Sequence, residues 1–215
     1  PQLELNTGGG SSLSFENSSY VSVPHSADLD IGENEPMSFS FWIIKSSSAE
    51  MHFLGKRAAQ NGNCSFQIAG SGNNVGIGSS NNWGILSMTS PTITETWTHV
   101  VFTFDGDMMS GYLNGTLEGS SSGSSLGPKS TVPLEIGTLQ WGQTHDLFDG
   151  FIDEVGIWNR ALSEEEVQSY MLAPPTGNES GLVSYWNFNE GIGTTVYDAT
   201  SNSNDGTIIN DPQWS

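Results

Sequence analysis

Short apolar segments separated by turn residues recur along the whole chain and limit what it can fold into. Apolar and polar residues alternate at 13–15, 20–23 and 37–41, and a fully apolar run follows at 41–44. Alternation with a period of two is typical of half-buried strands, and Gly, Ser, Asn and Asp fill the gaps as turn formers. About a dozen such segments predict an all-β fold, a two-sheet antiparallel jelly-roll sandwich.

One segment has helical character instead. Ser163 precedes three glutamates, and the apolar residues Val167, Tyr170 and Met171 follow at helical spacing. Ser163 and Glu166 fit a capping box, and acids in the first turn complement the positive end of the helix dipole. The sequence therefore predicts one short helix that ends before the prolines at 174–175.

Composition excludes several classes of function. The chain has 24 acidic residues against five Lys and Arg, a net charge of -19, which argues against nucleic acid because a phosphate-binding surface needs clustered cations. The apolar runs are too short for a membrane-spanning helix. The single cysteine, Cys64, forms no internal disulfide and is predicted to be a small buried strand residue.

Four runs carry a resemblance to a known family. Residues 97–106 (WTHVVFTFDG) and 111–115 (GYLNG) resemble the W-x-H-V…DG…Y-x-N-G run of laminin-G-like, concanavalin A-like jelly rolls, and 150–163 (GFIDEVGIWNRALS) resembles a second signature of that family. Residues 182–191 (LVSYWNFNEG) close the chain instead of opening it. This chain order is similar to that of pentraxins, which implies one domain over 1–215 whose last strands pair with its first.

The same superfamily contains glucan hydrolases, so catalysis is the first function to consider. Retaining glycosidases of this fold place two carboxylates on one strand face in an E-x-D-x-x-E run, and no such run exists here. Asp153 and Glu154 are consecutive in a predicted strand and are expected to face opposite sides of the sheet. The chain is therefore predicted not to be an enzyme.

Two polar loops contain the candidate ligand-binding residues. Trp83 and Trp141 lie outside the apolar strands, where an exposed indole stacks on a sugar ring or folds back on its own domain. In pentraxins the matching loops hold the calcium ions that bind the ligand, but here they have few carboxylates, so a weak or absent ligand-bridging calcium is expected. The candidate set is Trp83, Asn61, Asn63, Gln140, Trp141, His145 and Asp146.

A structural calcium is the second candidate site. The strand at 151–158 is apolar on both faces, so an inward Asp153 needs a partner. In laminin-G-like domains a calcium often lies near this strand and the first turn, which implies ligands from Asp153, Glu16 and Asn17, with Asp149 in reach. The alternative is that Asp153 accepts backbone N–H bonds without a metal, and the sequence leaves both open.

These features predict a non-catalytic binding module for a polysaccharide or other glycan, located outside the cell or on a cell or particle surface. Because the chain starts at Pro1 without Met or a signal segment, we expect it to be a mature piece of a longer protein with neighbouring domains as partners. The alternative is a structural or spacer domain of an adhesin, fibre or viral particle that binds no glycan.

Overall fold

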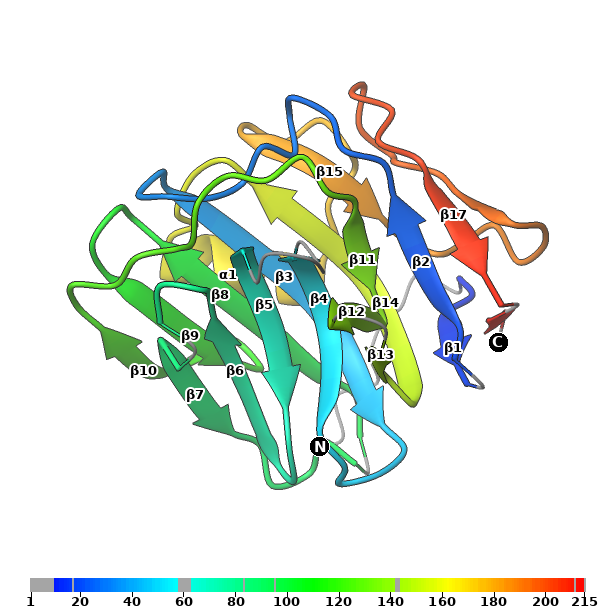
Figure 1. Cartoon of the computed structure of the whole chain (residues 1–215), viewed down its shortest axis with the longest axis horizontal. Helices are drawn as coiled ribbons and strands as arrows, with labels where there is room; N and C mark the ends of the chain where they lie inside the picture. Colours follow the sequence, from blue (N-terminus) through cyan, green and yellow to red (C-terminus); the bar gives the residue numbers. More distant parts are fainter. Residues whose placement is uncertain are drawn as a thin grey trace.

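The computed structural model describes residues 10–16, 18–57, 63–82, 84–94, 96–141, 144–210 and 212–214. Two antiparallel sheets of eight strands each face one another, and the predicted all-β, jelly-roll sandwich is confirmed. Figure 1 shows the sheet that contains β4, β5 and β6 in front of the sheet that contains β3 and β14. We call the rear sheet A and the front sheet B.

Sheet A has the order β10-β9-β8-β3-β14-β1-β18, and β15 also pairs with β14. Its strands are β1 (Leu13–Phe15), β3 (Met37–Lys45), β8 (Thr98–Phe104), β9 (Met109–Leu113), β10 (Thr116–Ser121), β14 (Gly150–Trp158), β15 (Leu182–Trp186) and β18 (Gln213–Trp214).

Sheet B has the order β16-β17-β2-β11-β4-β5-β6-β7. Its strands are β2 (Tyr20–Val23), β4 (Met51–Arg57), β5 (Cys64–Gly70), β6 (Asn74–Gly78), β7 (Leu86–Thr89), β11 (Leu134–Ile136), β16 (Thr195–Val196) and β17 (Gly206–Ile209). A separate two-stranded hairpin is made of β12 (Thr138–Trp141) and β13 (Thr144–Leu147).

The core lies between the two sheets and is built from the alternate positions that the sequence pattern predicts. Phe39 of β3 packs on Phe66 of β5 with ring centroids 4.3 Å apart, and Phe41 lies 6.3 Å from Phe53. Cys64 is fully buried, as expected, and burial raises the pKa of its thiol to about 12. The thiol is therefore protonated at neutral pH.

The predicted helix is confirmed as α1 (Glu164–Leu172). The Ser163 hydroxyl accepts a bond from the Glu166 backbone N–H, and the Glu166 carboxylate accepts one from the Ser163 N–H, which completes the capping box. The helix covers the outer face of sheet A, where Trp158 stacks on Tyr170 with centroids 5.5 Å apart. A second, smaller apolar cluster, which includes Val101, Val167 and Leu182, is buried there.

The first and last described strands pair with each other, as the order of segments predicts. β18 pairs with β1 in sheet A, and β17 pairs with β2 in sheet B. The two alternating runs at 13–15 and 20–23, separated by a short turn, predict a hairpin or a bulged strand. This prediction is wrong, because β1 pairs with β14 and β18 whereas β2 pairs with β11 and β17. The turn after Phe15 carries the chain from one sheet to the other.

The acidic segment 198–205 forms a hydrogen-bonded turn. Asp198 accepts bonds from the backbone N–H groups of Tyr185 (3.0 Å), Thr200 (3.0 Å) and Asn204 (2.9 Å). Its own N–H donates to the Asp205 carboxylate at 2.9 Å. These bonds agree with the Asx-turn chemistry typical of such segments and fasten the chain after β16 onto β15.

Candidate functional site

The outer face of sheet B is hollowed between β5 and β7. Phe66, Ile68, Val75 and Ile77 point into the core, so the alternate positions of these strands point outward. Those outward positions hold small or polar residues and line a cavity of about 230 Å³ with Glu50 and Asn74 at its border. The outward set is Gln67, Ala69, Gly76, Gly78 and Ser87. We call this cavity the sheet B groove.

The β12–β13 hairpin lies across β4 (Figure 1). Gly55 makes this approach possible, because a Cβ at that position would be 2.5 Å from Cδ1 of Leu139. β4 is the neighbour of β5 in the sheet, so the hairpin borders the groove on one side. The sequence predicted a loop here, and the structure has two short paired strands instead.

Four predicted ligand residues lie on this hairpin. Gln140 pairs with His145, and Asp146 pairs with Leu139. Trp141 pairs with Thr144 at the tip. The backbone thus brings these four residues together next to the groove, while the directions of their side chains lie outside what the structure describes.

The remaining predicted ligand residues belong to two loops at one end of sheet B. β4 and β5 are antiparallel neighbours, as are β6 and β7, so the connections 58–63 and 79–85 leave the same end. The Ser80 N–H donates to the Cys64 carbonyl at 3.0 Å, which holds the second loop against the first. Asn63 is exposed at this junction, while Asn61 and Trp83 lie outside the described residues.

The groove-lining residues were not predicted as site residues. A signal exists in the sequence, because the outward positions of residues 65–78 are almost all Gly, Ala, Ser or Gln rather than the charged residues usual on an exposed strand face. Such a row of small residues marks a surface that another molecule approaches closely.

Asp153 and Glu154 lie on one face of sheet A, and the expectation that they face opposite sides is wrong. The pairing of β14 with β3 shifts by one residue between Asp153 and Gly156, and Glu154 has φ of 54°. This β-bulge leaves Ile152 and Val155 as successive core residues, so both acids are turned to the outer face.

The two carboxylates are nevertheless closed to solvent. Asp153 is 3% exposed and Glu154 8% exposed. Asp153 accepts the Glu154 backbone N–H at 2.9 Å, and the Tyr185 hydroxyl donates to Glu154. Burial raises the pKa of Asp153 to about 7; burial and then repulsion by Asp153 raise that of Glu154 to about 8.

The predicted calcium ligands are only partly brought together. Glu16 and Asp149 line one cavity of about 380 Å³. They come together because Phe15 pairs with Gly150, and Glu16 directly follows Phe15 while Asp149 directly precedes Gly150. Asp153 does not line this cavity, and Asn17 lies outside the described residues. Among the described residues, no three His, Cys, Asp or Glu side chains are arranged to hold a metal. Calcium therefore stays a prediction.

His99 has a hydrogen-bonded structural role. Its Nε2 lies 2.9 Å from the Ser40 hydroxyl, its ring packs on Trp42, and its backbone N–H donates to Asn114 at 2.9 Å. Complete burial lowers the pKa of the imidazole to about 3, so it is neutral at pH 7.

Comparison with known proteins agrees with this architecture. The family model of the concanavalin A-like lectin/glucanases superfamily matches residues 15–168. No curated protein matches the chain. In the described part of the chain, no helix has the length and apolarity that a membrane crossing requires.

Three solved structures share the fold. A candidate carbohydrate-binding protein from Bacteroides ovatus ATCC 8483 has a TM-score of 0.75 and 21% identity over 96% of this chain, which spans 59% of that protein's length. A heptameric SAP-like pentraxin from Limulus polyphemus has a TM-score of 0.61 and 16% identity, covering 84% of this chain and 92% of its own. The CBM40 of a Ruminococcus gnavus sialidase, bound to α2,3-sialyllactose, has a TM-score of 0.60 and 15% identity. The match covers 76% of this chain and 100% of the CBM40 chain.

Proposed function

Because the chain belongs to the concanavalin A-like lectin/glucanase superfamily, we propose that it is a carbohydrate-binding module that holds its ligand in the sheet B groove. The observation that carries the proposal is an open sheet face of small residues, bordered by a hairpin that contains Trp141. Aromatic faces beside amide side chains suit sugar rings, which need both stacking and hydrogen bonds.

The ligand class follows from charge. The chain carries a net charge of -19, and Glu50 is the charged residue that lines the groove. The negative charge of the chain would repel an anionic polysaccharide at long range, whereas it would not repel a neutral one. Gln67, Asn74 and Ser87 supply neutral donors and acceptors for hydroxyl groups. We therefore expect a neutral polysaccharide.

A groove-filling variant tests the site. Ser87 is exposed on β7 and lines the groove, so Ser87→Trp should abolish binding of neutral oligosaccharides on a glycan array and in calorimetry. Ser120 is exposed on β10 of sheet A, so Ser120→Trp is the matched control and should bind like the unmodified protein. Trp141→Ala and Trp83→Ala should each weaken binding through lost stacking, by about 1–3 kcal/mol by analogy with stacked bases.

The module is proposed to be non-catalytic. The bulge makes Asp153 and Glu154 neighbours on one face, so strand alternation no longer separates them. Their burial beneath the outer face of sheet A, with Glu154 bonded to Tyr185, is what keeps them from a glycosidic bond. A reducing-sugar assay on the bound polysaccharide should show no product. Turnover that Asp153→Asn or Glu154→Gln abolished would contradict this.

The alternative is a spacer domain that contacts its neighbours in a larger chain and binds no glycan. Ile192 and Tyr197, 80% and 59% exposed, favour such contacts because a neighbouring domain would cover these large side chains. The glycan array separates the two functions, since a spacer binds no sugar. A polysaccharide ligand implies a location outside the cell or on its surface, which is proposed with the binding function.

A further inference from the structure

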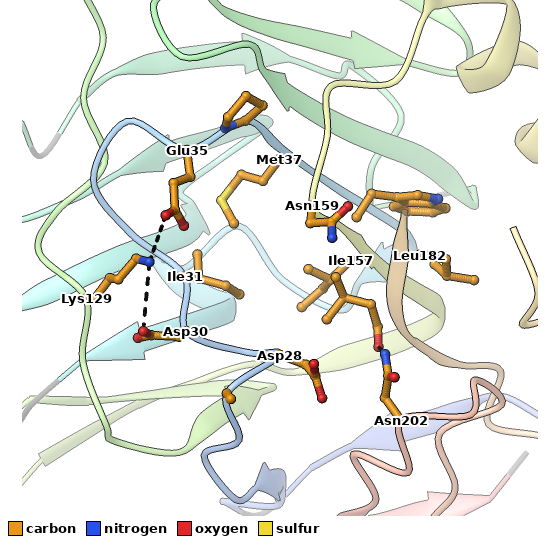
Figure 2. Close-up of a pocket in the computed structure, with 14 residues that line it drawn as sticks. Asp28, Asp30, Ile31, Glu35, Met37, Lys129, Ile157, Asn159, Leu182 and Asn202 are labelled. Atoms are coloured by element: carbon orange, nitrogen blue, oxygen red, sulfur yellow. Dashed lines mark hydrogen bonds and ion pairs between the residues drawn. The ribbon is translucent and has the colours of Figure 1, made fainter. Parts of the chain in front are cut away.

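A second and larger cavity, of about 650 Å³, lies at one end of the sandwich and shares no lining residue with the sheet B groove. Its walls come from the β2–β3 connection, from Lys129, from the end of β14 and the start of β15, and from the loop at Asn202. Figure 2 shows Lys129 with Asp30 and Glu35 on one side of this cavity and Asn159 and Asn202 on the other. We call it the end cavity.

The floor of the end cavity is apolar and its rim is polar. Ile31, Met37, Ile157 and Leu182 line it, and each is less than one-tenth exposed. Asp28, with an exposed side chain, lies at its edge. An apolar floor with a few polar groups around it is the usual composition of a small-ligand site.

Hydrogen bonds fix the walls. In the β2–β3 connection, Lys56 donates to the Leu29 carbonyl at 2.5 Å, and the Glu33 N–H donates to the Gly127 carbonyl at 2.7 Å. The Ser26 hydroxyl donates to Asn204 at 2.6 Å and joins this connection to the loop of Asn202. Because these walls are already ordered, a ligand loses little free energy in ordering them.

The free polar groups of the end cavity mainly accept hydrogen bonds. Lys129 is 2.8 Å from Glu35 and 3.9 Å from Asp30, so these two acids share one cation. In the described part of the chain, the side chains of Asp28 and Asn159 form no hydrogen bond or ion pair. Asn202 donates its Nδ2 to the Val183 carbonyl at 2.8 Å, which leaves its Oδ1 as an acceptor.

The charges select the ligand. The lining of the end cavity has three carboxylates, those of Asp28, Asp30 and Glu35, and one cation, Lys129. Lys56 also interacts with Asp30, so Asp28 is the lining carboxylate that has no cation partner among the described residues. The carboxylates are spread around the rim, and none of the metal-holding groups sought among the described residues occurs. A ligand that donates hydrogen bonds, carries positive charge and has an apolar part complements this surface.

We infer that the end cavity binds an aliphatic ammonium group, with the methylenes over Ile31, Met37 and Leu182 and the ammonium donating to Asp28 and the asparagine oxygens. Such a group occurs in free diamines and in the lysine side chain of a partner protein. Both sources share the chemistry that the cavity recognises, and the experiment below separates them.

The test titrates the full chain with cadaverine at low ionic strength and follows binding by calorimetry and by backbone amide shifts at residues 27–37. We expect saturable binding, no response to 1,5-pentanediol, which has the same length without charge, and loss of binding in high salt. Asp28→Asn should weaken binding about tenfold, since the acceptor loses its negative charge and the hydrogen bond to the ammonium becomes weaker. Asp107, exposed in the β8–β9 turn, gives the matched control Asp107→Asn, which removes the same charge elsewhere and should change Kd by less than about twofold.

A second titration with Nα-acetyl-lysine methylamide separates the sources. Tighter binding of this compound than of cadaverine assigns the cavity to a lysine of a partner protein, and the reverse order assigns it to a free diamine. The inference is overturned if cadaverine does not bind, if pentanediol binds equally well, or if Asp107→Asn weakens binding as much as Asp28→Asn. Ser87→Trp leaves this cavity untouched, so the failure of glycan binding and the failure of ammonium binding are distinguishable.

Discussion

The outer face of sheet A is covered by other parts of the chain, whereas part of the outer face of sheet B is open. The outer face of sheet A is covered by α1, and large residues such as Trp158 and Tyr185 fill the contact. The outer face of sheet B between β5 and β7 carries Gln, Ala, Gly and Ser and is left open. The size of the outward side chains therefore distinguishes the face that packs on the helix from the face that remains available for a ligand.

Polar groups follow the same division. Sheet A buries Asp153, Glu154 and His99 beneath its outer face, and burial shifts the pKa of each toward the neutral form. The polar residues at the sheet B groove, such as Asn74 and Ser87, remain exposed. Polar residues on the covered face thus cost stability, whereas those on the open face remain free to bind.

The largest expected effect is on the covered face. Trp158→Ala removes a fully buried indole that stacks on Tyr170, and it should lower the free energy of unfolding by about 3–5 kcal/mol in urea denaturation. On the open face, Ser87→Trp should change it by less than about 0.5 kcal/mol. Equal losses from the two variants would contradict the comparison.

The second prediction concerns pH. The folded-state pKa values of Asp153 and Glu154, about 7 and 8, exceed the ordinary values of 3.8 and 4.5, so the folded protein binds more protons than the unfolded chain between these limits. The free energy of unfolding should therefore fall as pH rises from about 5 to 8, with a slope of at most about 1.4 kcal/mol per pH unit for each of the two groups. Glu166 and Glu179 have lowered pKa values in the folded protein. The stability that they contribute is therefore lost only as pH falls below about 4.5.

Urea denaturation at pH 5, 6, 7 and 8 measures this dependence. Asp153→Asn should flatten the slope and be more stable than the unmodified protein at pH 8, because it removes a buried carboxylate that must ionise. Asp107→Asn, at an exposed acid, should keep the original slope. A slope that Asp153→Asn leaves unchanged would show that the bulge acids do not titrate in this range.

The smallest expected effect comes from calcium, which the sequence predicts with ligands from Asp153, Glu16, Asn17 and Asp149. We now place it at Glu16 and Asp149, because Asp153 does not line the cavity that these two acids share. A calcium that binds only the folded form at a hundredfold excess over Kd adds about 2.7 kcal/mol, or about 5–11 °C in Tm, relative to EDTA at matched ionic strength. Since Glu16 and Asp149 share a cavity, Asp149→Asn should lose this increment and Asp153→Asn should keep it. Magnesium is the control, and an equal rise with magnesium would indicate charge screening.

Local sequence patterns are sufficient to predict the individual elements. Alternation around Phe39 and Phe41 fixed which strand faces are buried, and Ser163 with Glu166 fixed where α1 begins. These predictions succeeded because the apolar alternation of a strand and the capping of a helix depend on residues only a few positions apart. The motif-carrying runs also predicted the fold class, and the closure of the chain by β17 and β18 followed from their order.

The candidate sites, in contrast, depend on how distant parts of the chain pack together. The bulge that turns Asp153 and Glu154 to one face arises where β14 meets β3, and the groove exists because β5, β6 and β7 lie side by side with the β12–β13 hairpin over β4. The crossing from β1 to β2 likewise depends on which strands each one pairs with. Register and sheet order are set by contacts between residues far apart in the chain, and a local sequence pattern does not contain those contacts.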